Sequence, residues 1–391
     1  MSKELSLLNL EDEGICSALE IERNYSLSQA VQNDSLILYS ESDLRSKIKD
    51  IAGDYAVDEE TIYSIYYSLM MGNVILEGPP GTGKTSLAKD ICQRLFNVKL
   101  EVVTANTEWT VYDLVGRKTL DLDEAGNERA VPEDGHITKS IVNCCKQISD
   151  SEDDTSKHQA VWLIIDELNR CKIDRAFGEF FTVLSGVCDQ PLNLPHQFDH
   201  NKELHVPKRY RIVGTMNSQD KTFVNSFSQA FARRFNFVLV DIPRDKELLR
   251  REATLTTERA FVEVAKLTGF ADGNELKESL ASPDFDEAIA VIDEIVNLIR
   301  FGNGASKALV DIGTAQLIDT KKAFILRCTY DSKNLDTNLD WAISIKLLHQ
   351  LDVDSIMEDL QHPFINAIPK RLKGTIKNVE RIWRIYANAE E

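Results

Sequence analysis

The chain has 391 residues, 43% of them hydrophobic and 28% charged, which is typical of soluble globular proteins. Its formal net charge of −18 gives it no overall basic field, so we do not expect this chain to bind nucleic acid directly. No apolar run reaches the length of a membrane span, which excludes a membrane protein. The polar N-terminus and seven cysteines without a C-x-x-C pair favour a cytoplasmic location over secretion.

The patterning predicts three parts. Residues 1–41 are polar with weak periodicity and form an N-terminal arm, either flexible or docked on a partner. Residues 42–243 alternate apolar strands with helices, which predicts an α/β core whose parallel sheet is sandwiched by helices. Residues 244–391 read as successive amphipathic helices and predict an all-helical lid domain. The expected strands are 74–76, 98–103, 161–165, 211–214 and 235–240; the expected lid helices are 245–267, 285–301, 306–327, 338–351 and 373–387.

A phosphate-binding loop follows the first expected strand. The sequence there is GPPGTGKT, which fits G-x-x-x-x-G-K-[ST] between a strand and a helix. Its glycines let backbone N–H groups turn toward phosphate, and the helix start adds partial positive charge. Lys84 is predicted to reach the β- and γ-phosphates, and the Thr85 hydroxyl to bind Mg²⁺. The predicted nucleotide-binding residues here are Gly78, Pro79, Pro80, Gly81, Thr82, Gly83, Lys84, Thr85 and Ser86.

Two acids end the apolar strand at 161–165. Carboxylates at the carboxyl end of a parallel strand lie at the sheet edge where such folds bind ligands. Asp166 is predicted to hold Mg²⁺ together with Thr85, and Glu167 to polarise the attacking water as general base. An Asp-Glu pair that merely meets solvent is the alternative, and the nearby phosphate loop disfavours it.

Two later segments complete the predicted chemistry. Asn217 follows the strand at 211–214 and is placed to hydrogen-bond the attacking water and the γ-phosphate. Arg233 and Arg234 close a helix just before the last strand. A solvated helix end is one reading of the two arginines. In a ring they would instead reach the neighbouring subunit's γ-phosphate and stabilise charge in the transition state.

The order and spacing of four motifs, GPPGTGKT, LIIDELNR, GTMN and ARRF, resemble those of AAA+ ATPases, well over residues 60–242 and loosely in the lid. The segments after LIIDELNR and GTMN are most similar to the McrB-type branch, with the MoxR chaperones as near relatives. The resemblance implies an AAA+ core of the P-loop NTPase class with a helical lid.

The resemblance also implies residue roles. Asn217 would be a sensor, and Arg170 would lie near the γ-phosphate or the subunit interface. Arg233 and Arg234 would be the trans-acting fingers. Lys307, in the segment GASK, would take the place of a second-sensor arginine, although lysine does not replicate a bidentate contact. Two insertions, Val115–Gly135 and Gly186–Pro207, would line the pore of the ring.

Three functions follow as hypotheses. The first is a hexameric homo-oligomeric ring that hydrolyses a nucleoside triphosphate with Mg²⁺ and powers a separate nuclease subunit, as in McrB-type modification-dependent restriction. The second is a MoxR-type chaperone that remodels protein complexes and works with a von Willebrand A protein. The third is a nucleotide-dependent assembly switch with slow turnover. ATP is favoured because most AAA+ relatives use it, and GTP stays open.

Overall fold

A computed structural model describes residues 23–122, 128–151, 157–178, 180, 191–194, 203–218, 228–302, 308–351 and 364–387. The chain divides into two compact units. The first comprises Met1–Ile51, Glu59–Glu77 and Thr85–Leu239; the second comprises Ala52–Asp58, Gly78–Lys84 and Val240–Glu391. Residues 78–84 of the phosphate loop therefore group with the C-terminal helices.

A five-stranded sheet forms the centre of the first unit. Its strands run in the order β2-β5-β8-β1-β9, and the β1–β9, β2–β5 and β5–β8 pairs are parallel. The strands are β1 (Asn73–Gly78), β2 (Lys99–Thr104), β5 (Val161–Asp166), β8 (Ile212–Asn217) and β9 (Phe235–Leu239). Strand β8 also runs in the same direction as β1, because Ile212 contacts Asn73 and Gly214 lies beside Ile75. The carboxyl ends of β5, β8 and β1 therefore lie at one edge of the sheet, which is where the predicted site residues follow the strands.

The five predicted strands are confirmed to within two residues at each end, except that β8 runs three residues beyond the predicted end at 214. The inner strands β1, β5 and β8 are largely buried because both faces of the sheet are covered there, whereas the edge strands β2 and β9 include exposed residues. Val74, Ile75 and Leu76 of β1 are fully buried, and so are Leu163, Ile164 and Ile165 of β5.

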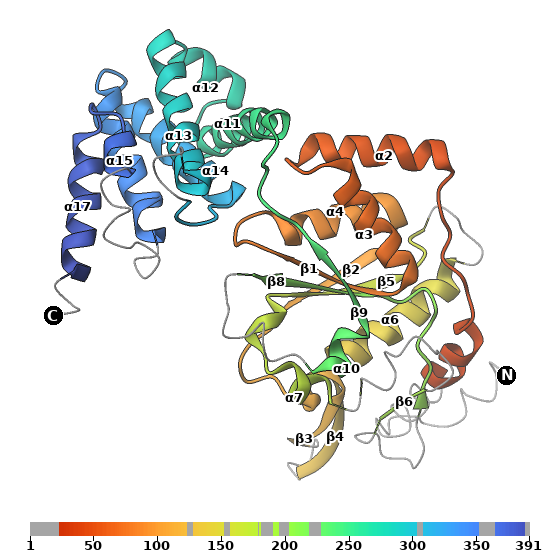
Figure 1. Ribbon diagram of the computed structural model, residues 1–391. Coiled ribbons are helices and arrows are strands. Elements are labelled where there is room, and N and C mark those ends of the chain that lie inside the picture. Colours follow the sequence, from red (N-terminus) through yellow and green to blue (C-terminus); the bar gives the residue numbers. More distant parts are fainter. Residues whose placement is uncertain are drawn as a thin grey trace. The chain divides into compact units, whose positions relative to one another are not determined.

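Helices cover both faces of this sheet, as predicted (Figure 1). Helices α3 (Glu59–Met71) and α4 (Lys84–Phe96) lie on one face, and α6 (His136–Ser151) lies on the other. The Phe96 ring joins the layers, because its centroid lies 4.9 Å from that of Tyr66 on α3 and 4.9 Å from that of Trp162 on β5. Helix α2 (Glu41–Asp54) precedes α3.

The first expected insertion is a β-hairpin. Strands β3 (Gly116–Leu122) and β4 (Glu128–Asp134) pair antiparallel from Gly116 opposite Asp134 to Leu122 opposite Glu128. The first unit also contains four short helical elements: α5 (Val111–Leu114), η1 (Leu168–Arg170), α7 (Ile173–Phe177) and α10 (Gln229–Ala232). Of the second insertion the structure describes only a short antiparallel pair, β6 (Leu192–Asn193) with β7 (Glu203–Leu204), and its flanking residues.

Residues 34–40 of the predicted arm have no regular secondary structure and follow a helical stretch at 23–31 and a turn at 32–33. The side chain of Gln159, 5% exposed, holds this segment like a strand partner. Its Oε1 accepts from the Ile37 N–H at 2.7 Å, and its Nε2 donates to the Ile37 carbonyl at 2.9 Å. Arg209 adds a hydrogen bond from its Nε to the Ser35 carbonyl at 2.7 Å.

The second unit is helical after β9, as predicted. Its main helices are α11 (Lys246–Thr268), α12 (Gly273–Leu280), α13 (Pro283–Phe301), α14 (Thr314–Tyr330), α15 (Leu335–Lys346) and α17 (Lys373–Ala387), with η2 (Leu348–Gln350) after α15. N-cap side chains start α11, α12 and α13: Asp245, Asp272 and Ser282 accept backbone N–H groups of the first turns. Helix α12 was not expected from the sequence.

Helix α14 begins later than the predicted start at residue 306. The described residues 308–313 are not helical, and polar contacts to α13 hold them. The Leu309 N–H donates to the Ile299 carbonyl at 2.8 Å, and Arg300 Nε donates to the Ile312 carbonyl at 2.6 Å. Gly313 is the N-cap residue, and the helix starts at Thr314.

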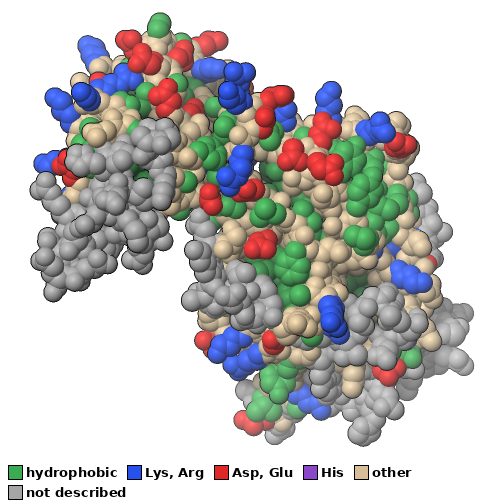
Figure 2. Space-filling view, viewed as in Figure 1, with side chains coloured by type: hydrophobic (Ala, Val, Ile, Leu, Met, Phe, Trp, Pro, Cys, Tyr) green, Lys and Arg blue, Asp and Glu red, His purple; other side chains and the backbone are tan. Residues whose placement is uncertain are grey.

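On the face drawn in Figure 2, Lys and Arg side chains are interspersed with Asp and Glu side chains. No helix in the described part of the chain is long and apolar enough to cross a membrane.

Candidate nucleotide-binding site

The phosphate loop joins the end of β1 to the first residue of α4. Three of its glycines are required by geometry, one because of a close approach of the backbone and two because of their backbone conformation. A Cβ on Gly78 would lie 2.0 Å from the Val240 carbonyl oxygen, so any side chain there would displace backbone. Gly81 has a φ of +77° and Gly83 a φ of +80°, in the left-handed region that side chains rarely adopt. The sequence therefore folds here into a tight turn whose shape depends on glycine.

Lys84 places a buried positive charge inside this loop. It is 7% exposed, and its ammonium donates to the carbonyl oxygens of Gly78 at 3.0 Å and Pro79 at 2.7 Å. It is also the first residue of α4, whose N-terminus carries partial positive charge. Ammonium, loop backbone and helix start together favour an anionic ligand such as a phosphate chain.

The structure brings Thr85 and Asp166 together, as the predicted metal site requires. Thr85 Oγ1 donates to Asp166 Oδ1 at 2.6 Å, although 81 positions separate the two residues. Both groups are oxygen ligands, the kind that Mg²⁺ binds with the help of substrate phosphates. The pair therefore fits Mg²⁺, with Thr85 contributing a hydroxyl and Asp166 a carboxylate.

A residue that sequence reasoning missed, Thr215 on β8, organises the two acids. Its hydroxyl donates to Asp166 Oδ1 and accepts from the Glu167 backbone N–H at 3.0 Å. Thr215 is 2% exposed, so this bridge lies inside the protein. The sequence signal that could have revealed this role is the position of Thr215 near the end of a predicted strand. A hydroxyl at that position can reach Asp166 if the two strands are neighbours.

Glu167 leaves β5 in an unusual backbone conformation. Its φ of 54° and ψ of 43° are left-handed, and among the described non-glycine residues only Asn97 shares a positive φ. Such strain costs on the order of 1–3 kcal/mol and tends to occur at functional sites. The Glu167 carboxylate is 29% exposed, and its Oε2 lies 2.7 Å from Arg170 Nε. Arg170 therefore pairs with the predicted general base within one chain.

Asn217 ends β8 at the same sheet edge. Its backbone N–H donates over 3.5 Å to Oδ1 of Asn169, which is 2% exposed and belongs to the turn after Glu167. The strand order thus brings Asp166, Glu167 and Asn217 to one edge. Ser86 lies on α4 and is exposed.

The two arginines lie elsewhere in the first unit. They directly precede β9, and Phe235 at the start of β9 pairs with Asn73 at the start of β1. Arg233 and Arg234 are therefore at the amino end of the strands, opposite the edge that carries Asp166 and Glu167. Arg233 is exposed, whereas Arg234 is half-buried and donates from its guanidinium to the Ala230 carbonyl. Lys307 falls outside the described residues.

A second contact that the sequence did not reveal lies within the second unit. The Gly81 carbonyl accepts the Ala315 N–H at 2.8 Å, in the first turn of α14. A Cβ on Gly313 would lie 2.3 Å from the Pro80 carbonyl oxygen. Helix α14 thus starts in direct contact with the phosphate loop. More than 200 positions separate the partners, and no motif joins them, so periodicity could not have found this contact.

Comparison with known proteins gives a consistent result. Residues 73–235 match the family model described as the AAA domain of the dynein-related subfamily. The McrB subunit of a type IV methyl-directed restriction enzyme from Escherichia coli is 26% identical over 228 residues, 55% of this chain and 46% of that subunit. The uncharacterized protein YojN from Bacillus subtilis is 24% identical over 234 residues, 59% of this chain and 68% of that protein.

This chain thus matches about half the length of the McrB subunit. A solved structure of NtrX from Brucella abortus in complex with ADP has a TM-score of 0.42 and 15% identity, covering 96% of this chain and 67% of that chain. A TM-score that low carries no functional argument.

Proposed function

Residues 73–235 of this chain are an AAA domain similar to that of McrB-type ATPases, and from that premise we propose that the protein is a nucleoside triphosphatase with ATP as favoured substrate. The observation that most directly supports this proposal is the hydrogen bond from Thr85 Oγ1 to Asp166 Oδ1, at 2.6 Å. Thr85 directly follows Lys84, whose side chain is buried. In the proposed complex the Lys84 ammonium would neutralise phosphate oxygens of the nucleotide. Thr85 and Asp166 would hold Mg²⁺, which would supply further positive charge at the phosphates.

Glu167 is proposed as the general base. A carboxylate of this kind, held at the sheet edge by the strained turn and by Thr215, can accept a proton from the attacking water. Arg170 Nε, 2.7 Å from Glu167 Oε2, helps to fix the direction of that carboxylate. Asn217, at the end of the neighbouring strand, is proposed to orient the same water through its side-chain amide.

The proposed active unit is a ring, most simply a hexamer, in which Arg233 or Arg234 completes the neighbouring subunit's site. The position of these arginines supports this, because the opposite edge of the sheet puts them out of reach of their own acids. A positive charge from a neighbour would stabilise the charge that develops on the transferred phosphoryl group. Exposed Arg233 is the better candidate than Arg234, which already bonds Ala230.

The proposed role of the ring is to power a separate partner protein. Similarity to the McrB subunit supports a nuclease partner and a defence function, as in modification-dependent restriction. A MoxR-type chaperone with a von Willebrand A partner is the second candidate, and a slow assembly switch is the third. The proposed general base, Glu167, favours the restriction and chaperone functions over the assembly switch, because a switch does not require a general base.

The direct test is phosphate release by the purified chain with ATP or GTP, in Mg²⁺ and after chelation by EDTA. We expect turnover with ATP that requires Mg²⁺ and increases when protein is concentrated. Faster turnover with GTP would change the substrate assignment and leave the mechanism intact. No turnover of either nucleotide, at concentrations where the protein has assembled, would contradict the proposal.

A further inference from the structure

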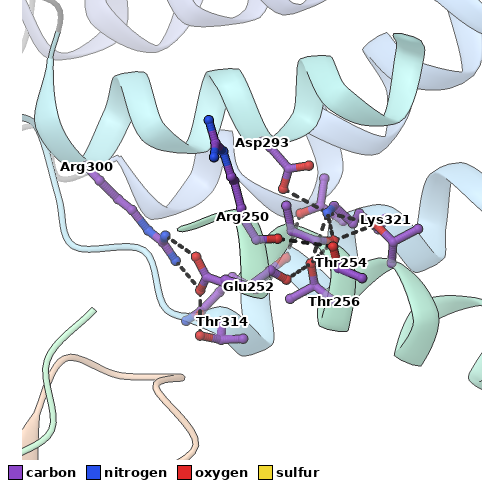
Figure 3. A network of polar contacts seen from close by, with 12 residues as sticks. Arg250, Glu252, Thr254, Thr256, Asp293, Arg300, Thr314 and Lys321 are labelled. Carbon is purple, nitrogen blue, oxygen red and sulfur yellow. Dashed lines mark hydrogen bonds and ion pairs between the residues drawn. The ribbon is translucent and has the colours of Figure 1, made fainter. Parts of the chain in front are cut away.

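Two ion pairs, the first fully buried and the second with a carboxylate that is 20% exposed, join three helices of the second unit (Figure 3). Arg300 on α13 and Glu252 on α11 are each 1% exposed and form a bidentate pair, with nitrogen–oxygen distances of 2.6 and 3.0 Å. Lys321 on α14 is fully buried and lies 2.8 Å from Asp293 on α13. Its ammonium also donates to the hydroxyls of Thr256 and Thr257 at 2.9 and 3.0 Å.

The first pair differs from the second because it also holds the start of α14. Arg300 Nε donates to the Ile312 carbonyl at 2.6 Å, and Thr314 Oγ1 donates to Glu252 Oε1 at 2.6 Å. Residues on both sides of Gly313 are therefore attached to the buried pair. Figure 3 shows Arg300, Glu252 and Thr314 converging in this way.

The turn that this pair fixes is the turn that contacts the phosphate loop. Gly313 packs so closely on Pro80 that a Cβ would lie 2.3 Å from its carbonyl oxygen, and Ala315 donates its N–H to Gly81 at 2.8 Å. The side-chain oxygen of Gln316 is buried beside Gly81, with no hydrogen-bond partner among the described residues. The loop and the first turn of α14 thus fit each other without spare room.

Stability alone does not account for a charged pair at this place. Removing two charges from water is costly, and apolar residues of similar volume often stabilise a protein as well or better. A guanidinium fork and a carboxylate instead impose direction, because each hydrogen bond fixes where its partner lies. Here the hydrogen bonds of the pair fix the positions of Ile312 and Thr314, the residues on either side of Gly313, which contacts the loop.

We propose that Glu252 and Arg300 are positioning residues for the phosphate loop: they set the first turn of α14, which holds Pro80 and Gly81 in the conformation that binds nucleotide. The inference rests on the proposed nucleotide-binding function. Neither residue needs to touch the nucleotide. Their effect reaches it through Thr314, Gly313 and the loop backbone.

Thr314 offers the mildest test, because both buried charges stay paired when it is changed. Thr314→Val keeps the shape of the side chain and removes the hydroxyl that bonds Glu252, whereas Thr314→Ser keeps the hydroxyl. Thr329→Val is the matched control, since Thr329 lies near the other end of α14 and bonds only the Leu326 carbonyl among the contacts observed. The measurement is the dissociation constant of a fluorescent ATP analogue, taken well below each variant's melting temperature.

We expect Thr314→Val to weaken binding about tenfold, the effect of losing one hydrogen bond to a charged group, while Thr314→Ser and Thr329→Val stay near the unaltered chain. Binding by Thr314→Val within about twofold of the unaltered chain would overturn the inference, because a tenfold effect is expected from the lost bond. No binding by the unaltered chain would instead contradict the proposed function itself, and the inference with it.

A second comparison separates positioning from general stability. Glu252→Gln and Asp293→Asn each convert the carboxylate of a buried ion pair to an amide within the same unit. Both should lower the melting temperature, because each leaves a buried cation without its counter-charge. Only Glu252→Gln should also weaken nucleotide binding in the folded protein. Equal effects of the two variants on the dissociation constant would mean that the first pair has no special link to the loop.

Discussion

Thr215 shows how much one side chain can organise at the residue scale. By bonding both Asp166 and the backbone of Glu167, it ties the metal ligand to the general base. The left-handed turn at Glu167 costs free energy that this bond and the pairing with Arg170 help to offset. Sequence motifs singled out both acids as candidates, but they could not show the hydrogen bonds from Thr215 that hold them.

Glu167→Gln should separate binding from chemistry. The amide keeps the size of the side chain but cannot accept a proton, so we expect unchanged nucleotide affinity and turnover lower by about 10²-fold or more. Phosphate release and a nucleotide titration on the same preparation measure the two effects. Glu101→Gln, on β2 away from the predicted acids, is the control. Near-normal turnover would mean that another group activates the water.

Lys84→Ala should remove most nucleotide binding. The loss of charge-assisted bonds to phosphate is expected to weaken affinity by about 10- to 100-fold or more. Lys89→Ala, on the same helix but outside the loop, should bind like the unaltered chain. Fluorescent-nucleotide titration gives both values, and equal affinity of the two variants would contradict the assignment of the loop.

At the element scale, the sequence predicted best where one element carries its own signal. The alternation of apolar strands and helices predicted a parallel sheet and the positions of its strands along the chain. The motifs marked the ends of those strands. The start of α14 was predicted too early, because polar contacts with Arg300 and Ile299 hold residues between 308 and 313 in a non-helical segment. Contacts between distant segments, such as that of Ala315 with Gly81, carry no local pattern, so sequence alone could not supply them.

Gly78→Ala tests the fit of the loop at this scale. The added Cβ would meet the Val240 carbonyl oxygen at 2.0 Å, and because the obstacle is backbone, the loop must move. We expect a lower melting temperature and loss of nucleotide binding. Gly53→Ala is the matched control, since a Cβ on Gly53, in helix α2, meets nothing within 4 Å. It should leave binding unchanged and stabilise the helix by about 0.5–1 kcal/mol.

At the scale of the whole molecule, the arrangement of the sheet separates Arg233 and Arg234 from the acids of the same chain. A protein with both arginines changed to alanine should therefore still bind nucleotide. If the arginines act as fingers, its rate of hydrolysis should be lower by about 10³–10⁵-fold. The exposed Arg233 should account for more of the loss than Arg234 when each is changed alone.

Mixing experiments test whether the site is shared. The double-arginine variant keeps an intact loop, and the Lys84→Ala variant keeps intact arginines, so mixed rings should recover part of the activity. Specific activity of the unaltered chain should also rise with concentration as subunits assemble. Constant specific activity on dilution, together with no recovery on mixing, would show that each chain hydrolyses nucleotide alone.

The hydrogen bonds of the Gln159 side chain affect how the protein responds to truncation and to limited proteolysis. Removing residues 1–40 would take away the two hydrogen bonds between the Gln159 side-chain amide and the Ile37 backbone, each worth about 0.5–1.5 kcal/mol, and would leave its bond to the Phe96 carbonyl. A protease that cleaves the chain between 33 and 38 must first detach this segment from Gln159. Resistance to limited proteolysis there should therefore fall in Gln159→Ala, and a shortened chain starting after residue 40 should melt at a lower temperature.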